Sequence, residues 1–323
     1  MEMRRLGKTG LRISALGLGT LTWGRDTLEA DAANQLEAYV NAGGNVVDTS
    51  PTYGEGEAEA VLGKLLGEGI SGLVARDDLV IISKAGVARR QGHSFVEASR
   101  KQLLAQLEAT LKSLNTDYLD LWMLQVPDPE TDFDQVLATL HAAWTSGKAR
   151  FVGLSNHSAW QCAYAASELN RGDNPPGLAA VENEYSLLNR DIERELLPAA
   201  DALKFGVIGW SALGRGVLTG KYRSSTPPDS RGASAHLQGF VQPYLRTRPR
   251  RIVESIATAA EGLHTSCLGV SLAWILQTAV ETALISARTT EQLNQILHAT
   301  ETKLPKQVLQ ALNEVSNPET PVD

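Results

Sequence analysis

Short apolar runs rich in β-branched residues alternate with longer amphipathic segments along this 323-residue chain. The segment 100–114 shows the second pattern, because its leucines recur at the spacing of one helix face. This alternation predicts repeated βα units built around a parallel sheet. Eight such units in a chain of this length are typical of a closed (β/α)8 barrel. The eight strand-like runs are 15–19, 45–48, 79–83, 118–124, 151–154, 179–182, 207–210 and 283–286.

Two segments interrupt the alternation. Near the start, the runs 3–7 and 11–14 flank a Lys-Thr-Gly turn and predict a β-hairpin that precedes the barrel and caps its bottom. Later, residues 224–250 contain a proline pair, two glycines and a cluster of arginines, which predicts a long loop over the C-terminal face. Long loops are uncommon without a function, so a substrate or cofactor lid is favoured over disorder. Residues 1–323 are predicted to form a single barrel domain.

Composition narrows the classes of partner. The net charge of −7 argues against nucleic acid as the main partner and favours a small molecule. No apolar window is long enough to cross a membrane, the first residues lack a secretory signal pattern, and the two cysteines lie far apart. We therefore expect a soluble, cytoplasmic protein without a disulfide framework. The six histidines lack paired ligand spacing, so no metal site is predicted, and the oligomeric state stays open.

Three ionisable groups lie at or near the ends of two predicted strands. Asp48 ends the run 45–48, Tyr53 follows in a loop marked by glycine and proline, and Lys84 follows the run 79–83. An ammonium beside a phenol lowers the phenol pKa from about 10, and a carboxylate keeps the ammonium charged. The three residues therefore predict a proton donor for a substrate oxygen. Two alternatives stay open, namely that Asp48 only caps a helix or turn, and that the three groups form a buried polar network without catalysis.

Several motifs follow one another in a fixed order over nearly the whole chain. They are Gly17-Leu18-Gly19-Thr20, the segment 48–54 (Asp-Thr-Ser-Pro-Thr-Tyr-Gly), Lys84, Ser155-Asn156, the segment 184–187 (Glu-Tyr-Ser-Leu), the segment 210–222 (Trp-Ser-Ala-Leu-Gly-Arg-Gly-Val-Leu-Thr-Gly-Lys-Tyr) and the segment 287–293 (Ala-Arg-Thr-Thr-Glu-Gln-Leu). Each motif is weak alone, but the ordered set is specific. Together they resemble the aldo-keto reductase family, and its bacterial and channel-β-subunit-like branches in particular.

The resemblance implies a (β/α)8 barrel that binds NADPH in extended form across its C-terminal face and passes hydride to a carbonyl. It implies that Tyr53 is the general acid, tuned by Lys84 and Asp48, and that Trp210 stacks on the nicotinamide. An arginine at position 288 favours NADPH over NADH. The remaining implied cofactor contacts are Ser155 and Asn156 at the carboxamide, Ser211, Leu213, Arg215 and Gly216 at the pyrophosphate, Arg288 and Gln292 at the 2′-phosphate, and Gly19, Thr20, Asp48, Lys221 and Ser286 elsewhere along the site.

The chain departs from the family pattern at three positions. Gln125 stands where the family has a fourth catalytic residue, a histidine, and its amide can donate a hydrogen bond to a substrate oxygen but cannot titrate. Glu182 replaces a glutamine that contacts the carboxamide, and a carboxylate can accept from the amide NH2 but cannot donate. Ile296 replaces an asparagine that contacts adenine.

Two functions of different class follow from the resemblance. The first is an NADPH-dependent reductase of aldehydes or reactive ketones with Tyr53 as proton donor. The second is a cofactor-binding regulatory or interaction protein like the channel β-subunits, which also carry an amide in place of the histidine. The presence of Tyr53, Lys84 and Asp48 together favours the enzyme. The substrate stays open, as does whether Trp23 and Trp122 line a pocket or pack in the core, and whether the arginines of 224–250 attract an anionic substrate or face solvent.

Overall fold

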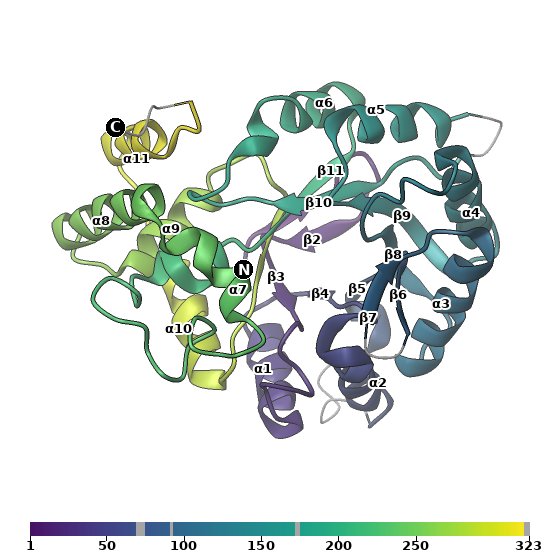
Figure 1. Cartoon of the computed structure of the whole chain (residues 1–323), viewed down its shortest axis with the longest axis horizontal. Helices are drawn as coiled ribbons and strands as arrows, with labels where there is room; N and C mark the ends of the chain where they lie inside the picture. Colours follow the sequence, from purple (N-terminus) through teal and green to yellow (C-terminus); the bar gives the residue numbers. More distant parts are fainter. Residues whose placement is uncertain (69–74, 91–92, 172–174, 320–323) are drawn as a thin grey trace.

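The computed structural model describes residues 1–68, 75–90, 93–171 and 175–319, and it forms one closed barrel of eight parallel strands surrounded by helices (Figure 1). This confirms the predicted (β/α)8 architecture. Each predicted strand agrees with the observed one to within two residues at either end. In barrel order the strands are β3 (Leu16–Gly19), β4 (Val46–Asp48), β5 (Val80–Ala85), β8 (Leu119–Leu124), β9 (Ala149–Ser155), β10 (Ala180–Glu184), β11 (Gly206–Trp210) and β12 (Thr282–Ile285), which pairs back with β3.

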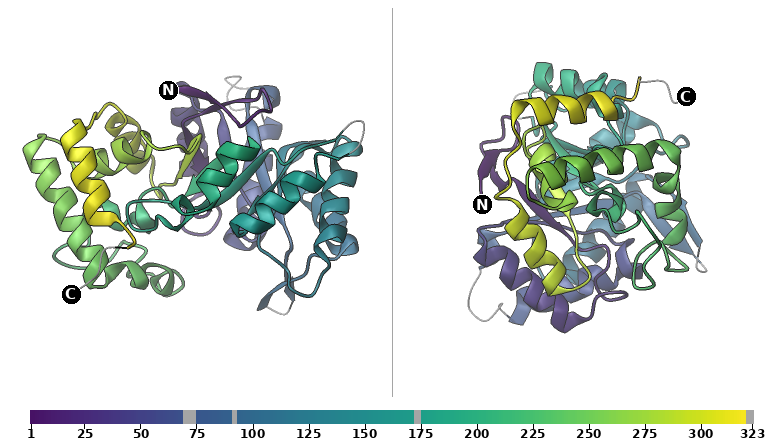
Figure 2. Two further views of the ribbon diagram at one scale, coloured as in Figure 1. Left: turned by 90° about the horizontal axis from the view of Figure 1, so that it is seen from above. Right: turned by 90° about the vertical axis from the view of Figure 1, so that its left-hand side faces the viewer.

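The helices pack their apolar faces against the outside of the barrel. The helix predicted at 100–114 is α3, whose Ser99 hydroxyl caps the first turn and whose Leu103, Leu107 and Leu111 are buried. The others that follow barrel strands include α1 (Glu29–Asn41), α2 (Glu57–Glu68), α4 (Phe133–Thr145), α5 (Ala159–Glu168), α6 (Leu196–Leu203), α9 (Cys267–Ile275) and α10 (Thr290–Ala299). Two further helices, α8 (Thr247–Gly262) and α11 (Lys306–Ser316), pack together at one end of the molecule (Figure 2).

The N-terminal hairpin closes the barrel bottom, as predicted. Strands β1 (Met3–Arg5) and β2 (Arg12–Ser14) pair antiparallel, and Leu6 and Ile13 join the apolar cluster inside the barrel. Leu6 packs so tightly on Gly206 that a Cβ there would lie 2.5 Å from the leucine Cδ1. Arg4 fixes the hairpin to the connection between α9 and β12, donating to the carbonyls of Val280 at 2.9 Å and Leu276 at 2.6 Å.

The predicted loop at 224–250 is shorter than expected. Residues 238–245 form two short helices, α7 (Gln238–Val241) and η5 (Gln242–Leu245), and α8 begins at Thr247, so the loop prediction is wrong from residue 238 onward. Helix is favoured in this region because Val241, Ile252 and Val253 are buried. Pro249 does not oppose it, because a proline in the first turn of a helix removes no intrahelical hydrogen bond. We call residues 224–245 the lid segment.

One element has no counterpart in the prediction. After β5 the chain forms an antiparallel hairpin of β6 (Val87–Arg90) and β7 (His93–Val96), outside the barrel sheet. Its residues alternate too weakly in hydrophobicity to mark a strand pair. Among the described residues, no helix is both long and apolar enough to span a membrane.

Candidate active site

Polar side chains collect at one end of the barrel. Asp48, Ser155 and Trp210 are the last residues of β4, β9 and β11. Lys84 lies near the end of β5, and the next strand, β8, ends one residue before Gln125. Because the carboxyl ends of parallel strands share one rim of a barrel, these groups meet although they are far apart in sequence.

Tyr53 lies between the Asp48 carboxylate and the Lys84 ammonium. It begins the short helix η1 (Tyr53–Gly56), and its backbone N–H donates to the Ser50 carbonyl at 3.0 Å. Its hydroxyl donates to Asp48 Oδ2 at 3.4 Å and accepts from Lys84 Nζ at 3.4 Å. Lys84 also donates to Asp48 Oδ1 and, at 3.2 Å, to the Thr49 carbonyl. The structure therefore brings the three predicted catalytic residues into one hydrogen-bonded cluster.

The pKa of Tyr53 does not follow the prediction. Burial raises it, and the Lys84 ammonium opposes the increase without overcoming it, so the predicted net lowering is wrong. For Lys84, burial alone would lower the pKa, but the Asp48 carboxylate, joined by Glu182 at the higher pH where Glu182 is ionised, outweighs burial and raises it. The phenol thus keeps its proton at neutral pH, next to an ammonium that stays charged. Such a phenol protonates a strong base, for example an oxygen that develops alkoxide character.

Gln125 is bonded to the loop that carries Tyr53. Its Oε1 accepts from Ser50 Oγ at 3.0 Å, and its Nε2 donates to Thr52 Oγ1 at 3.0 Å. Its backbone carbonyl accepts from the Asn156 side chain at 2.9 Å. One N–H of the amide is thereby committed to the protein, so the bond that we expected to a substrate oxygen would have to come from the other.

Glu182 adds a second carboxyl to the cluster. It projects from β10 (Ala180–Glu184), is 2% exposed, and its Oε2 lies 3.3 Å from Lys84 Nζ. Among the described residues, that oxygen has no partner with hydrogen-bond geometry. Burial, reinforced by the Asp48 carboxylate, raises the pKa of Glu182 to about 8. Glu182 is therefore mostly neutral at pH 7, and as an acid it can donate as well as accept, unlike the carboxylate considered from the sequence.

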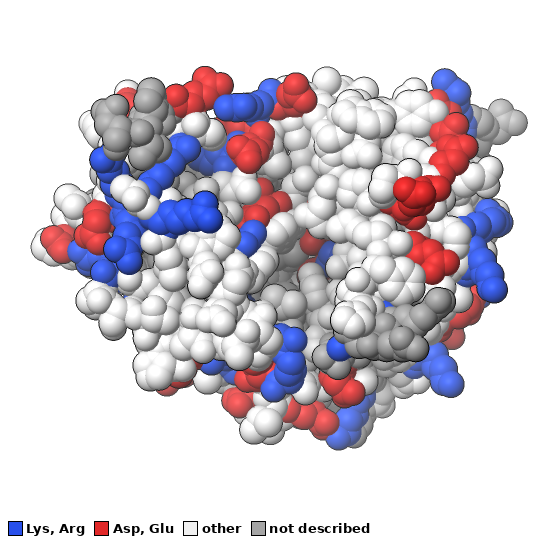
Figure 3. Space-filling model, in the orientation of Figure 1, with Lys and Arg blue, Asp and Glu red and all other residues white. Residues whose placement is uncertain are grey.

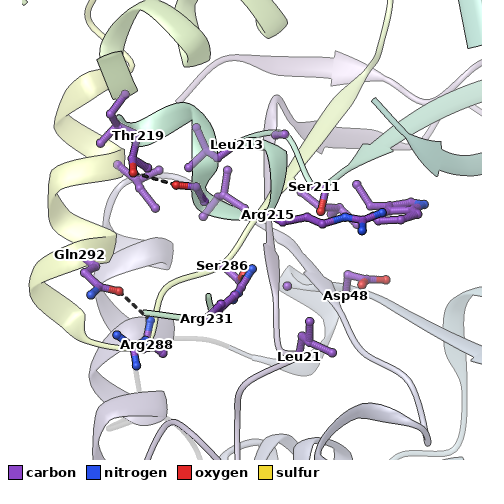
Figure 4. A pocket seen from close by; sticks show the side chains of 18 of the residues that line it. Leu21, Asp48, Ser211, Leu213, Arg215, Thr219, Arg231, Ser286, Arg288 and Gln292 are labelled. Carbon is purple, nitrogen blue, oxygen red and sulfur yellow. Dashed lines mark hydrogen bonds between the residues drawn. The ribbon is translucent and has the colours of Figure 1, made fainter. Parts of the chain in front are cut away.

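A cavity of about 1280 Å³ extends from this cluster past the β11 end to α10 (Figure 4). The space-filling view shows a hollow near the centre of this face of the molecule (Figure 3). The cavity is lined by Tyr53, Lys84 and Gln125 and by the predicted residues Gly19, Asp48, Ser155, Asn156, Glu182, Trp210, Ser211, Leu213, Arg215, Gly216, Lys221, Ser286, Arg288 and Gln292.

Some candidates lie elsewhere. Thr20 does not line the cavity, because it is fully buried below the rim and its hydroxyl donates to the Asp48 carbonyl at 3.1 Å. Trp23 and Trp122 are fully buried core residues, which decides that alternative in favour of packing. Ile296 lines the cavity near α10 and offers an apolar surface in place of an amide.

The loop after β11 has an unusual backbone and holds the lid segment. Ser211, Arg215 and Gly216 have positive φ, which costs free energy in the two non-glycine residues and is common at ligand sites. Arg215 forms a two-pronged ion pair with Glu184, at 3.0 and 2.7 Å, and donates to the Phe240 carbonyl at 2.5 Å. Its guanidinium also lies 3.8 Å from the centre of the Phe240 ring. The Arg215 side chain thus binds the lid segment, a contact that its predicted pyrophosphate role did not include.

Three cations meet at the far end of the cavity. Lys221, Arg231 and Arg288 all line it, and Figure 4 shows Arg231 beside Ser286 and Arg288 beside Gln292. Arg231 donates to Ser286 Oγ at 2.6 Å. Burial lowers the pKa of Lys221, and the two guanidinium groups lower it further. Like charges held together in this way favour an anionic ligand. Sequence reasoning placed Arg231 among the lid arginines and missed it as part of this end of the site.

The comparisons with known proteins agree with this geometry. The model of the Aldo/keto reductase family matches residues 15–317. The chain belongs to the aldo/keto reductase family.

The relatives of this aldo/keto reductase fall in the two branches that the sequence indicated. It is 32% identical to the uncharacterized oxidoreductase YrpG of Bacillus subtilis, over 98% of this chain and 96% of the relative. It is 28% identical to the aldo-keto reductase YhdN of the same organism, over 93% and 89%. It is also 31% identical to a probable voltage-gated potassium channel subunit beta of Oryza sativa, over 92% and 89%. Membership of the family supports an oxidoreductase function, and the family generally uses nicotinamide cofactors.

The residues of this family member fit a nicotinamide dinucleotide. At one end of the cavity, the orphaned Oε2 of Glu182 provides a polar partner for a carboxamide. The Asn156 Oδ1 beside it accepts from Trp210 Nε1 at 3.0 Å and has a second lone pair free to accept. At the other end, Lys221, Arg231 and Arg288 provide charge for a phosphate. Between them, Gly216 has a φ of +91°, a backbone conformation that residues with a side chain rarely adopt.

Proposed function

We propose that this protein is an NADPH-dependent reductase that converts an aldehyde or a reactive ketone to an alcohol. One observation carries the proposal, namely the Tyr53 hydroxyl held between Asp48 and Lys84 at the deep end of an elongated cavity. The small-molecule carbonyl substrate and a cytoplasmic location belong to the same proposal. The three cations at the other end support NADPH over NADH, because only NADPH carries the 2′-phosphate.

In this mechanism NADPH, when bound, supplies the hydride. Tyr53 donates its proton to the carbonyl oxygen as negative charge develops there, which its raised pKa permits because an alkoxide is a stronger base than a phenolate. Lys84 stabilises the phenolate that remains, and Asp48 holds Lys84 in place. Gln125 keeps the loop of Tyr53 in position through Ser50 and Thr52.

A second candidate is a regulatory protein that binds the cofactor without efficient turnover. It is favoured by the amide at position 125 and by the 31% identity to proteins named as potassium channel β-subunits. Lys84, Asp48 and Tyr53 are not needed for such a role, which is why we place the reductase first.

NADPH oxidation with an activated aromatic aldehyde tests the proposal. Tyr53→Phe should lower kcat/KM by roughly 10²- to 10⁴-fold, the usual contribution of a general acid. Tyr164→Phe is the matched control, because that exposed tyrosine on α5 donates only to Asp134 at 2.7 Å, and it should leave the rate unchanged. Cofactor binding, followed by NADPH fluorescence, should be equal in all three proteins. If NADPH binds but the wild type reduces nothing in a broad carbonyl panel, the reductase proposal fails and the regulatory one replaces it.

A further inference from the structure

Glu182 gives the cluster one carboxyl more than the positioning of Tyr53 requires. Asp48 and Lys84 already form a balanced pair in contact with the phenol. Glu182 approaches the same ammonium from the other side of the barrel mouth, with its Oε2 3.3 Å from Nζ. Lys84 Nζ thus lies near both groups: it donates to the Tyr53 hydroxyl at 3.4 Å, and it lies 3.3 Å from Glu182 Oε2 at an ion-pair distance without hydrogen-bond geometry.

The surroundings of Glu182 favour its neutral form. The charged or titratable groups that face it from other elements are Asp48, Lys84 and Tyr53. Its partners on the neighbouring strands, Ser155 on β9 and Ile208 on β11, carry no charge.

On its own strand, the side chain of Glu184 projects two residues further on and is already paired with Arg215. A second buried carboxylate beside Asp48 would leave the cluster with an uncompensated negative charge, which is costly at this depth. The raised pKa of Glu182 agrees with this reasoning.

The histidine that other family members carry is replaced here by Gln125, whose amide cannot exchange a proton. We propose that Glu182 holds the exchangeable proton of this active site and returns it through Lys84 to the Tyr53 phenolate after the substrate oxygen has been protonated. This inference rests on the proposed reductase function.

The step balances. The cofactor hydride forms the new C–H bond, and the Tyr53 proton forms the O–H bond of the alcohol. Lys84 passes one proton to the phenolate and receives one from Glu182, so the ammonium is restored. Glu182 ends as a carboxylate, which complements the positive charge of the oxidised nicotinamide ring. Solvent returns the proton to Glu182 after the oxidised cofactor leaves.

Glu182→Gln is the test variant, because an amide keeps the size and neutrality of the acid and removes its proton. Glu59→Gln is the matched control. Glu59 is also buried with a raised pKa, but it accepts from Ser83 at 2.6 Å and from Thr110 at 3.2 Å, outside the cavity. Both readouts below are made on the full chain and need no turnover, so they stay interpretable if the reductase proposal fails in the Tyr53→Phe experiment.

The first readout is the infrared carbonyl band of neutral carboxylic acids in the protein without cofactor. We expect part of this band to persist at pH 7, to disappear as the pH passes about 8, and to be missing in Glu182→Gln but present in Glu59→Gln. A band at pH 7 that is unchanged by Glu182→Gln would overturn the proposal.

The second readout is the number of protons released on binding, measured by calorimetry in buffers of different ionisation enthalpy. Wild type and Glu59→Gln should release up to one proton more with NADP⁺ than with NADPH at pH 7, and Glu182→Gln should show no difference. By linkage, the affinity for NADP⁺ relative to NADPH should rise with pH by up to about tenfold per unit in the wild type and in Glu59→Gln, which both keep the Glu182 proton. Equal proton release with both cofactors in the wild type would overturn the proposal even if Glu182→Gln did not fold.

Discussion

Replacing Arg215 by alanine should release the lid segment from the barrel. In the native protein the guanidinium joins Glu184, at the end of β10, to the carbonyl and the ring of Phe240 in α7. Tyr244 adds a hydroxyl bond to Glu184 at 2.9 Å, which the variant retains. The change therefore removes the charged contacts to Phe240 and the stacking of the guanidinium on the Tyr244 ring, whose centre lies 4.8 Å away.

The expected size of the effect follows from those contacts. A hydrogen bond to a charged group contributes about 1.5–3 kcal/mol, and stacking of a guanidinium on an aromatic ring about 0.5–1 kcal/mol. Local opening of α7 should thus become easier by roughly 2–4 kcal/mol, which is about a 30- to 1000-fold rise in the open population.

Hydrogen exchange measures this population directly. The amide groups of Phe240 and Val241 donate to the Leu237 carbonyl at 3.0 and 3.3 Å, so they exchange only when α7 opens. Peptides that cover 237–245 should therefore exchange about 30- to 1000-fold faster in Arg215→Ala, while the barrel strands change far less.

Arg223→Ala is the matched control for this experiment. Arg223 forms a similar two-pronged pair with Glu254, but the two side chains are 41% and 56% exposed, and such pairs contribute little. Its loss should leave exchange in 237–245 nearly unchanged. Unaltered exchange of α7 in Arg215→Ala would refute the reasoning, and an equal rise over the whole chain would show general destabilisation instead of release of the lid segment.

Three further predictions concern the cluster and the cationic end of the cavity. Native Glu182 keeps a proton that the unfolded chain gives up above about pH 4.5, so its contribution to the unfolding free energy should fall as the pH rises, by up to about 1.4 kcal/mol for each unit between pH 5 and 8. Urea titrations at several pH values should find that this fall is smaller in Glu182→Gln. Gln125→Leu should lower kcat roughly tenfold with little change in NADPH affinity, since it frees the loop bonded through Ser50 and Thr52; a loss of affinity with unchanged kcat would contradict this role. Arg231→Ala should weaken NADPH binding about tenfold or more and leave NADH binding unchanged in fluorescence titrations, and equal weakening of both would remove the 2′-phosphate from the explanation.

The barrel and the positions of its strand ends follow from the sequence because the pattern is strong and the topology leaves few choices. Once eight parallel strands close, residues at their carboxyl ends must share one rim, which is how Asp48 and Lys84 come together across 36 residues. Trp210 reaches the cavity for the same reason.

Other features depend on three-dimensional contacts that no local pattern records. The pKa of Tyr53 rises because the effect of burial exceeds that of the neighbouring ammonium, and the sequence gives the neighbour but not the depth. The partners of Gln125, Ser50 and Thr52, lie more than 70 residues away. Arg231 reaches the cavity only through the path of the lid segment, which long-range packing determines.

The attachment of Arg4 to Leu276 and Val280 has a consequence for biosynthesis. The first strand of the barrel, β3, has to wait for β12 before its outer edge is paired. A nascent chain that has not yet emerged beyond β11 therefore carries two open sheet edges, and Arg4 of its hairpin lacks the carbonyls of Leu276 and Val280. Such edges promote aggregation, and pairing between distant segments is slow. We expect the barrel to close only once β12 has emerged from the ribosome, with the greatest demand on chaperones before that point.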